Sequence, residues 1–197
     1  MAVALKLRNI SKNFGPLEVF DNFNYSFHSN SLYKLSGPNG SGKTTLFKII
    51  KGIYLPDNGL IESNNTLNIT YIDNNPRSFF HRLNLNDNLN YFLSLNKNLG
   101  TYAVEELLDY FEISAYKTSL FSSLSQGQMQ LASIIRGLSC SSDIVLLDES
   151  FSFLDDNIKS KLESLLIKKN NEDNTLVIFS SHDAQIFSET SFIEIKL

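Results

Sequence analysis

The stretch that decides how this chain folds is Gly37-Pro38-Asn39-Gly40-Ser41-Gly42-Lys43-Thr44-Thr45, which lies between a predicted strand and a predicted helix. It matches the pattern G-x-x-x-x-G-K-[ST]. Glycines let successive backbone N–H groups turn inward around an anion, and the helix N-terminus adds partial positive charge. Lys43 can reach the β- and γ-phosphates, and Thr44 offers a hydroxyl to Mg²⁺. A flexible glycine turn is the plain alternative, but the strand before and the helix after favour a nucleoside triphosphate site.

The elements around this loop predict an α/β fold. We expect strands at 3–8 and 17–35 and a helix near 43–51. Short strands follow at 60–62 and 69–73, and apolar spacing predicts helices within 85–95, 104–111 and 128–138. The last third returns to a strand, a helix and two strands, at 144–148, 156–168, 175–180 and 192–197.

A second motif is the apolar run Ile144 to Leu147, which ends in Asp148 and Glu149. An apolar run without alternation suits a parallel strand buried on both faces, and ligands bind at the carboxyl ends of such strands. We expect Asp148 to hold Mg²⁺, and Glu149 to accept a proton from, or orient, the water that attacks the γ-phosphate. The alternative is a solvated strand end or a helix cap.

Between the two motifs lies Leu124-Ser125-Gln126-Gly127-Gln128, which resembles the LSGGQ signature of the ATP-binding cassette (ABC) ATPases. The resemblance extends along essentially the whole chain. It implies one ABC ATPase domain over 1–197, with a P-loop NTPase core of mainly parallel sheet at about 1–75 and 143–197. It also implies an N-terminal antiparallel β subdomain and an inserted helical subdomain at about 76–142.

The resemblance gives further residues a role. Ser125, Gly127 and Gln128 would bind the nucleotide of a second ABC subunit, so that two subunits pack head to tail around two ATP molecules. Without the resemblance, 124–138 reads as a capped helix. His182 follows a strand where the family has its switch histidine, although a lone histidine there is usually a loop residue. Phe14 stands where an adenine-stacking aromatic is usual, and packing against the first sheet is its alternative.

The chain departs from the family pattern at several positions. Gln126 replaces the first glycine of the signature, but Ser125 and Gly127 keep the anion site. In the D-loop, Ser150 and Phe153 stand where proline and a small residue are usual, and the bulk of Phe153 suggests a heterologous partner.

Asn74 occupies the position of the Q-loop glutamine, which approaches Mg²⁺ and the attacking water. Asparagine keeps the amide but is one methylene shorter, so a slower or more tightly gated ATPase would follow unless a water bridges the gap.

Arg77-Ser78-Phe79-Phe80-His81-Arg82-Leu83 resembles the corresponding segment of exporter subunits, which receives the coupling helix of a membrane chain. An exposed pair of phenylalanines flanked by arginines suits an interface. The alternative is that Phe79 and Phe80 belong to the core. The short chain, without a C-terminal regulatory domain, also resembles compact exporter subunits such as the haem exporter of cytochrome c maturation.

Composition excludes several other classes of protein. A net charge of −4 argues against a nucleic-acid partner, because phosphate binding needs a basic face. The single cysteine, Cys140, excludes an intramolecular disulfide framework and a multi-cysteine zinc site, and we expect it in an apolar pocket. Charges at Lys6 and Arg8 oppose a signal peptide, and no apolar run is long enough to span a bilayer.

We therefore expect the ATP- and Mg²⁺-dependent ATPase subunit of a membrane ABC transporter. An exporter is the first choice, bound peripherally at the cytoplasmic face through a transmembrane permease. The alternatives are a soluble ABC ATPase without a membrane partner and a catalytically weak cassette acting as an interaction module. Retention of Lys43, Asp148, Glu149 and His182 argues against the weak cassette, whereas Asn74 and Gln126 favour it. The transported substrate is not encoded in any motif found here.

Overall fold

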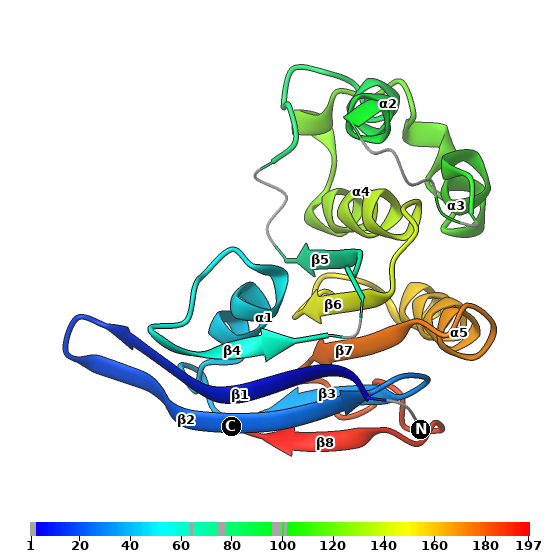
Figure 1. The fold of residues 1–197 in the computed structure, drawn as a ribbon. Coiled ribbons are helices and arrows are strands. Elements are labelled where there is room, and N and C mark those ends of the chain that lie inside the picture. Colours follow the sequence, from blue (N-terminus) through cyan, green and yellow to red (C-terminus); the bar gives the residue numbers. More distant parts are fainter. Residues whose placement is uncertain (1–2, 64, 75–77, 96–99, 101) are drawn as a thin grey trace.

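The computed structural model describes residues 3–63, 65–74, 78–95, 100 and 102–197. They form two sheets and a group of helices (Figure 1). The expected α/β fold with a parallel sheet, an antiparallel sheet and helices is confirmed.

The parallel sheet has the strand order β5-β6-β7-β3-β8. The strands are β3 (Leu32–Ser36), β5 (Ile69–Asp73), β6 (Ile144–Asp148), β7 (Leu176–Ser180) and β8 (Ile193–Lys196). Every residue of β6 and β7 is buried, as their unbroken apolar runs predict. All pairings in this sheet are parallel. The carboxyl ends of β3, β6 and β7 therefore lie at one edge, where the phosphate loop, Asp148 and His182 follow.

The antiparallel sheet has the order β2-β1-β4. Strand β1 (Val3–Phe14) pairs with β2 (Leu17–His28) and with β4 (Asn58–Glu62). Two sequence predictions were wrong here. The strand expected at 3–8 continues to residue 14, and the one expected at 17–35 is divided by a turn in which Asn30 has a φ of 55°. Asparagine tolerates this left-handed conformation better than most residues.

Helix α1 (Lys43–Lys51) follows the phosphate loop, and α5 (Asp156–Glu172) follows β6. The remaining helices, α2 (Leu85–Leu95), α3 (Val104–Tyr110) and α4 (Gln126–Leu138), lie together beyond β5 (Figure 1). Short 3₁₀ turns at Ser114–Tyr116 and Phe121–Ser123 connect α3 to α4.

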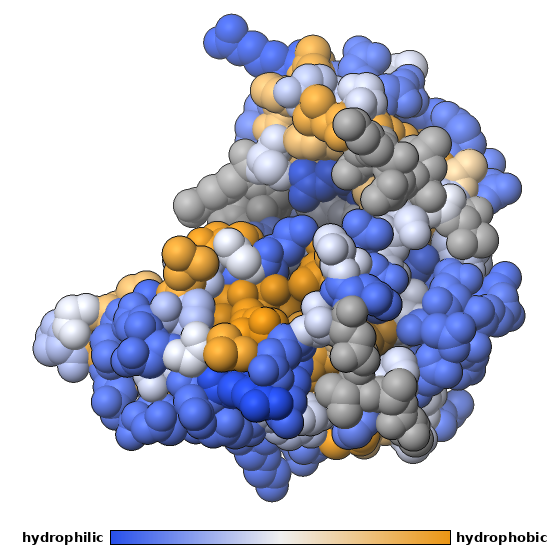
Figure 2. Space-filling view, viewed as in Figure 1, coloured by the Kyte–Doolittle hydropathy of each residue, from blue (hydrophilic) through white to orange (hydrophobic). Residues whose placement is uncertain are grey.

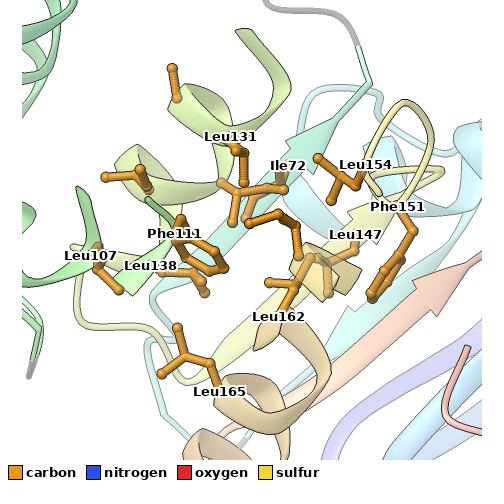
Figure 3. Close-up of a cluster of buried hydrophobic side chains, with 14 of the residues drawn as sticks. Ile72, Leu107, Phe111, Leu131, Leu138, Leu147, Phe151, Leu154, Leu162 and Leu165 are labelled. Atoms are coloured by element: carbon orange, nitrogen blue, oxygen red, sulfur yellow. The ribbon is translucent and has the colours of Figure 1, made fainter. Parts of the chain in front are cut away.

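The buried core has two parts. One joins α1 to the antiparallel sheet and to one face of the parallel sheet, through residues such as Leu46, Phe47 and Leu146. The other joins α2–α5 to the opposite face. In Figure 3, Leu138 and Leu147 belong to this second cluster, with Phe111 and Leu162 beside them. The cluster fixes α4 against β5 and β6.

Within the described ranges, the structure contains no helix that combines the length and the apolar character needed to cross a membrane.

Candidate functional site

The phosphate loop leads into the open N-terminus of α1. Gly42 precedes the helix with a φ of 100°, and a Cβ there would lie 2.8 Å from side-chain atoms of Phe20 and Val19. Glycine is therefore required at this position both by the left-handed backbone and by the lack of room for a Cβ. The N-cap residue, Gly42, has no side chain to cap this end of α1, and the first turn of the helix carries no acidic residue. Its backbone N–H groups and partial positive charge are available to an anion.

The amine of Lys43 bends back over its own loop. Its Nζ donates to the carbonyl oxygens of Gly37 at 2.7 Å and Pro38 at 3.1 Å. The ammonium is thereby held beside the same N–H groups that would cradle phosphates. A nucleotide phosphate would offer Lys43 a charged acceptor in place of neutral carbonyls.

A pocket of about 320 Å³ brings both motifs together. Its lining comes from the β1–β2 hairpin, the phosphate loop, the start of α1, the end of β6 and the second residue after β7. These residues are Phe14, Leu17, Val19, Asn39, Gly40, Gly42, Lys43, Thr44, Thr45, Asp148, Glu149 and His182. Leu17 and Val19 were not predicted from the sequence as residues of this pocket. Gly37, Pro38 and Ser41 belong to the same loop but do not line the pocket.

Asp148 is buried at the end of β6 and is held from both sides. The hydroxyl of Tyr71 on β5 donates to its Oδ2 at 3.0 Å, and the hydroxyl of Ser180 on β7 donates to its Oδ1 at 3.1 Å. Burial, followed by the charge of Asp148, raises the pKa of Tyr71, so this hydroxyl stays a proton donor. Neither hydroxyl was predicted from the sequence.

Glu149 has a strained backbone, with a φ of 52°. Its N–H donates to Ser180 Oγ at 3.1 Å, and the hydroxyl of the next residue, Ser150, donates to the carbonyl of Ile72 at 2.7 Å. A proline at position 150 has no hydroxyl to form this second bond. The departure from the family pattern therefore ties the chain after Glu149 to β5.

His182 faces Glu149 across the pocket. Its Nε2 lies 3.5 Å from Glu149 Oε1, an ion-pair distance when the imidazole is protonated. That carboxylate oxygen is buried and accepts no hydrogen bond from the residues the structure describes. Phe14 lies at the rim of the pocket with its ring in edge contact with Tyr54, and it is 42% exposed, which leaves ring surface for stacking.

The signature residues lie outside this pocket. Ser125, Gln126, Gly127 and Gln128 line a second pocket of about 560 Å³ with Phe153. Ser125 caps α4, because its Oγ accepts the N–H of Gln128 at 3.2 Å while Gln128 Oε1 accepts the N–H of Ser125 at 2.9 Å. The Ser125 hydroxyl proton remains available to an anion. Phe153 is 59% exposed and has a φ of 67°.

The structure places two other predicted segments. Asn74 is exposed after β5 and does not line the nucleotide pocket. Of the phenylalanine pair, Phe80 is exposed, but Phe79 is buried and stacks on Phe121 at 4.4 Å between ring centroids. The expectation of an exposed pair was therefore wrong for Phe79. Arg77 lies outside the described residues.

The donors present fit a magnesium ion. Mg²⁺ takes oxygen ligands, with one or two carboxylates and substrate phosphates supplementing its water shell. Thr44 and Asp148 provide a hydroxyl and a carboxylate in one pocket. In the described part of the chain, the two hydroxyls that donate to Asp148 are neutral, so these hydrogen bonds leave its negative charge intact.

The fold and this pocket define a P-loop nucleotide-binding protein. The family model for the ABC transporter matches residues 20–152. The chain is 31% identical to the sulfate/thiosulfate import ATP-binding protein CysA of Synechococcus elongatus, over 93% of this chain and 57% of that protein. It is 30% identical to a probable sulfate/thiosulfate import ATP-binding protein CysA of Chlorella vulgaris, over 92% of this chain and 81% of that protein. The chain belongs to the ABC transporter family, and both of these relatives are named as ATP-binding proteins.

Solved structures agree with this assignment. An inward-facing ABC transporter assigned to the metal-chelate type matches with a TM-score of 0.79 and 26% identity, over 100% of this chain and 80% of that one. A bacterial ABC transporter cassette solved as a dimer matches with a TM-score of 0.82 and 22% identity, over 98% of this chain and 94% of that one. The second likeness is evidence of the fold alone.

The relatives do not support the expected exporter. Both CysA proteins are named for import, and the chain spans little more than half the length of the Synechococcus protein.

Proposed function

We propose that this chain is the ATP-binding and ATP-hydrolysing subunit of a membrane ABC transporter and works through an ATP-sandwich dimer. The observation that carries the proposal is the convergence of Lys43, Thr44, Asp148, Glu149 and His182 on one pocket. The same proposal divides the chain into an ATPase core at about 1–75 and 143–197 and a helical subdomain at about 76–142.

In this proposal the chain's own residues bind and orient ATP. The loop N–H groups and the N-terminus of α1 hold the phosphates, Lys43 moves from the Gly37 and Pro38 carbonyls to the β- and γ-phosphates, and Phe14 stacks on the base. Thr44 and Asp148 would hold Mg²⁺, which neutralises developing charge on the phosphates when it is bound.

Glu149 is the proposed general base. Its Oε1 is buried with no hydrogen-bond donor among the described residues, so it can accept the proton of a water that attacks the γ-phosphate. His182, 3.5 Å from that oxygen, would contact the γ-phosphate and keep the carboxylate oriented. Asn74 does not line the pocket, so it would approach this water only after the segment at the end of β5 moves inward.

The second pocket is the basis for the proposed dimer. One chain supplies the phosphate loop, and Ser125, Gly127 and Gln128 lie in a different pocket of the same chain. They would bind the γ-phosphate held by a partner cassette, which is either a second copy or a related chain. Two such contacts related by head-to-tail packing close the sandwich.

A transmembrane permease is the proposed membrane partner, with this chain bound peripherally at the cytoplasmic face. Apolar side chains are exposed on and before α2, namely Phe80, Leu83, Tyr91 and Leu95. Figure 2 shows hydrophobic residues over α2 and in the hollow below the α2–α4 group. Such a surface suits contact with a helix of a membrane chain. Export remains the sequence prediction for the direction of transport, without support from the relatives.

Two experiments test the proposal. The purified protein should hydrolyse ATP with Mg²⁺, and Lys43→Ala should remove nucleotide binding; unaltered turnover in that variant would refute the assignment of the loop. Glu149→Gln, tagged and loaded with ATP, should capture a polytopic membrane protein from detergent-solubilised membranes, detected by mass spectrometry. Recovery of a partner-free cytosolic dimer would instead favour a soluble ABC ATPase.

A further inference from the structure

Two strands that flank β6 each bring a hydroxyl group to Asp148. Strands β5 and β7 flank β6, with Tyr71 opposite Leu146 and Ser180 opposite Asp148. Because Leu146 and Asp148 are two residues apart, their side chains point to the same face of the sheet as that of Tyr71. The tyrosine hydroxyl reaches Asp148 Oδ2 at 3.0 Å, and the serine hydroxyl reaches Oδ1 at 3.1 Å.

This arrangement fixes the carboxylate of Asp148 in one plane. Each oxygen accepts one hydroxyl, and a carboxylate oxygen has a second lone pair that stays free for a ligand. A carboxylate that is 6% exposed and has no such donors would carry an uncompensated desolvation cost. Neutral donors satisfy the oxygens without cancelling the charge that attracts a cation.

The tyrosine ring is itself held in place. It packs against Phe47 of α1, with 6.4 Å between ring centroids. Helix α1 begins at the phosphate loop, so the ring lies between that helix and Asp148. Ser180 has a double role, because its Oγ donates to Asp148 and also accepts the N–H of Glu149 at 3.1 Å. One serine thus positions both acidic residues.

We propose that Tyr71 and Ser180 are positioning residues that hold Asp148 in the orientation required of a Mg²⁺ ligand. Through Tyr71, the strand that runs into Asn74 is tied to the metal site. The inference rests on the proposed function, since it assigns Asp148 to the metal of an ATP complex. Partners that orient a metal ligand typically contribute about 10- to 100-fold to metal affinity or activity.

The alternative is that Tyr71 is only a packing residue of the core. The two cases differ in what Tyr71→Phe changes. The variant keeps the ring and its contact with Phe47 and deletes only the hydroxyl. A packing residue would lose a little stability and leave metal binding unaltered. A positioning residue loses metal affinity while the binding of metal-free nucleotide stays the same.

The experiment uses the whole chain and an ATP analogue with a fluorescent ribose group. Its affinity is measured in EDTA and across a Mg²⁺ titration, and Mn²⁺ binding to the nucleotide complex is followed by electron paramagnetic resonance. Tyr33→Phe is the matched control, because it removes a buried phenol hydroxyl that accepts the N–H of His28 at 3.0 Å. We expect Tyr71→Phe to weaken metal binding about 10-fold and Tyr33→Phe to leave it unchanged.

Each other outcome is decisive. Unaltered metal affinity in a folded Tyr71→Phe protein overturns the inference, and so does an equal loss of nucleotide affinity in EDTA and in Mg²⁺. If thermal unfolding finds that variant unfolded, Ser180→Ala gives the same test through Oδ1 of Asp148. A wild-type protein that binds the analogue without any effect of metal would contradict the proposed function itself.

Discussion

Replacing Gly127 by alanine tests whether the signature pocket acts separately from the nucleotide pocket. Gly127 is the second residue of α4, and a Cβ there would lie 2.6 Å from the carbonyl oxygen of Phe153. Non-bonded atoms do not approach this closely, and a backbone oxygen cannot rotate away. The start of α4 must therefore move away from the segment around Phe153.

The energy of this change can be bounded. Overpacking a site costs about 1–3 kcal/mol, whereas alanine is better than glycine in a helix by about 1 kcal/mol. The net loss of folding free energy is about 0–2 kcal/mol, which lowers the melting temperature of a chain of this size by at most about 8 °C. Gly127→Ala should therefore stay folded at room temperature.

Its activity should change far more than its stability. A misplacement of about 1 Å in a catalytic arrangement costs on the order of 100-fold in rate. We expect steady-state hydrolysis of ATP to fall by on the order of 10- to 100-fold. The affinity of the monomer for ATP should be unchanged, because Gly127 does not line the pocket of the phosphate loop.

The control is Gly137→Ala on the same helix. A Cβ there would meet the side chain of Ile72 at 2.7 Å, so it tests overpacking of α4 away from the signature. Full hydrolysis in a folded Gly127→Ala protein would refute the role of the signature pocket. An equal loss of hydrolysis in both variants would assign the effect to packing alone.

Three other predictions concern the Q-loop position, a buried amide and a surface ion pair. Asn74→Gln restores the missing methylene and should raise basal ATP hydrolysis in a phosphate-release assay. Asn88→Ala should lower the free energy of unfolding by about 2–4 kcal/mol in urea titrations, because the fully buried amide bonds both the N–H and the carbonyl of Phe80. Asp57→Asn should destabilise the protein at neutral pH. The Lys12 ammonium holds the pKa of Asp57 below its usual range. The ion pair therefore stabilises the folded protein above the unfolded pKa of about 3.9, and this contribution is lost as the pH falls through the lower pKa of the folded state.

Each of these has its own control. An unchanged rate in Asn74→Gln would mean that the shorter amide does not limit hydrolysis. The exposed Asn90 lies on the same helix as Asn88, and Asn90→Ala should have little effect; equal losses in the two variants would contradict the role given to the buried amide. For Asp57, a difference from the wild type that persists unchanged below pH 3 would rule out the ion pair as its source.

The sequence predicted β6 and β7 well, because both are apolar runs whose residues are all buried. It predicted β1 poorly, since residues 9–13 are mostly polar even though they continue the central strand of the antiparallel sheet. The turn at Asn30 has no glycine or proline to mark it. These errors arise where pairing with neighbouring strands, and not the local pattern, determines the structure.

Some residues of the candidate site could be predicted from the sequence, and others could not. The two motifs predicted Lys43, Asp148 and Glu149, and the family resemblance predicted His182; all four line one pocket. The hydroxyls of Tyr71 and Ser180 could not be predicted, because they lie 77 and 32 residues from Asp148 and meet it only through strand order. The packing of Phe79 likewise depends on Phe121, which follows much later in the chain.

The central claim is most directly tested with the Glu149→Gln variant, by gel filtration and light scattering with and without ATP. The variant binds ATP but lacks the proposed base, so a stable dimer should form in ATP and be absent in ADP. A protein that binds ATP and remains monomeric at high concentration would contradict the ATP-sandwich mechanism.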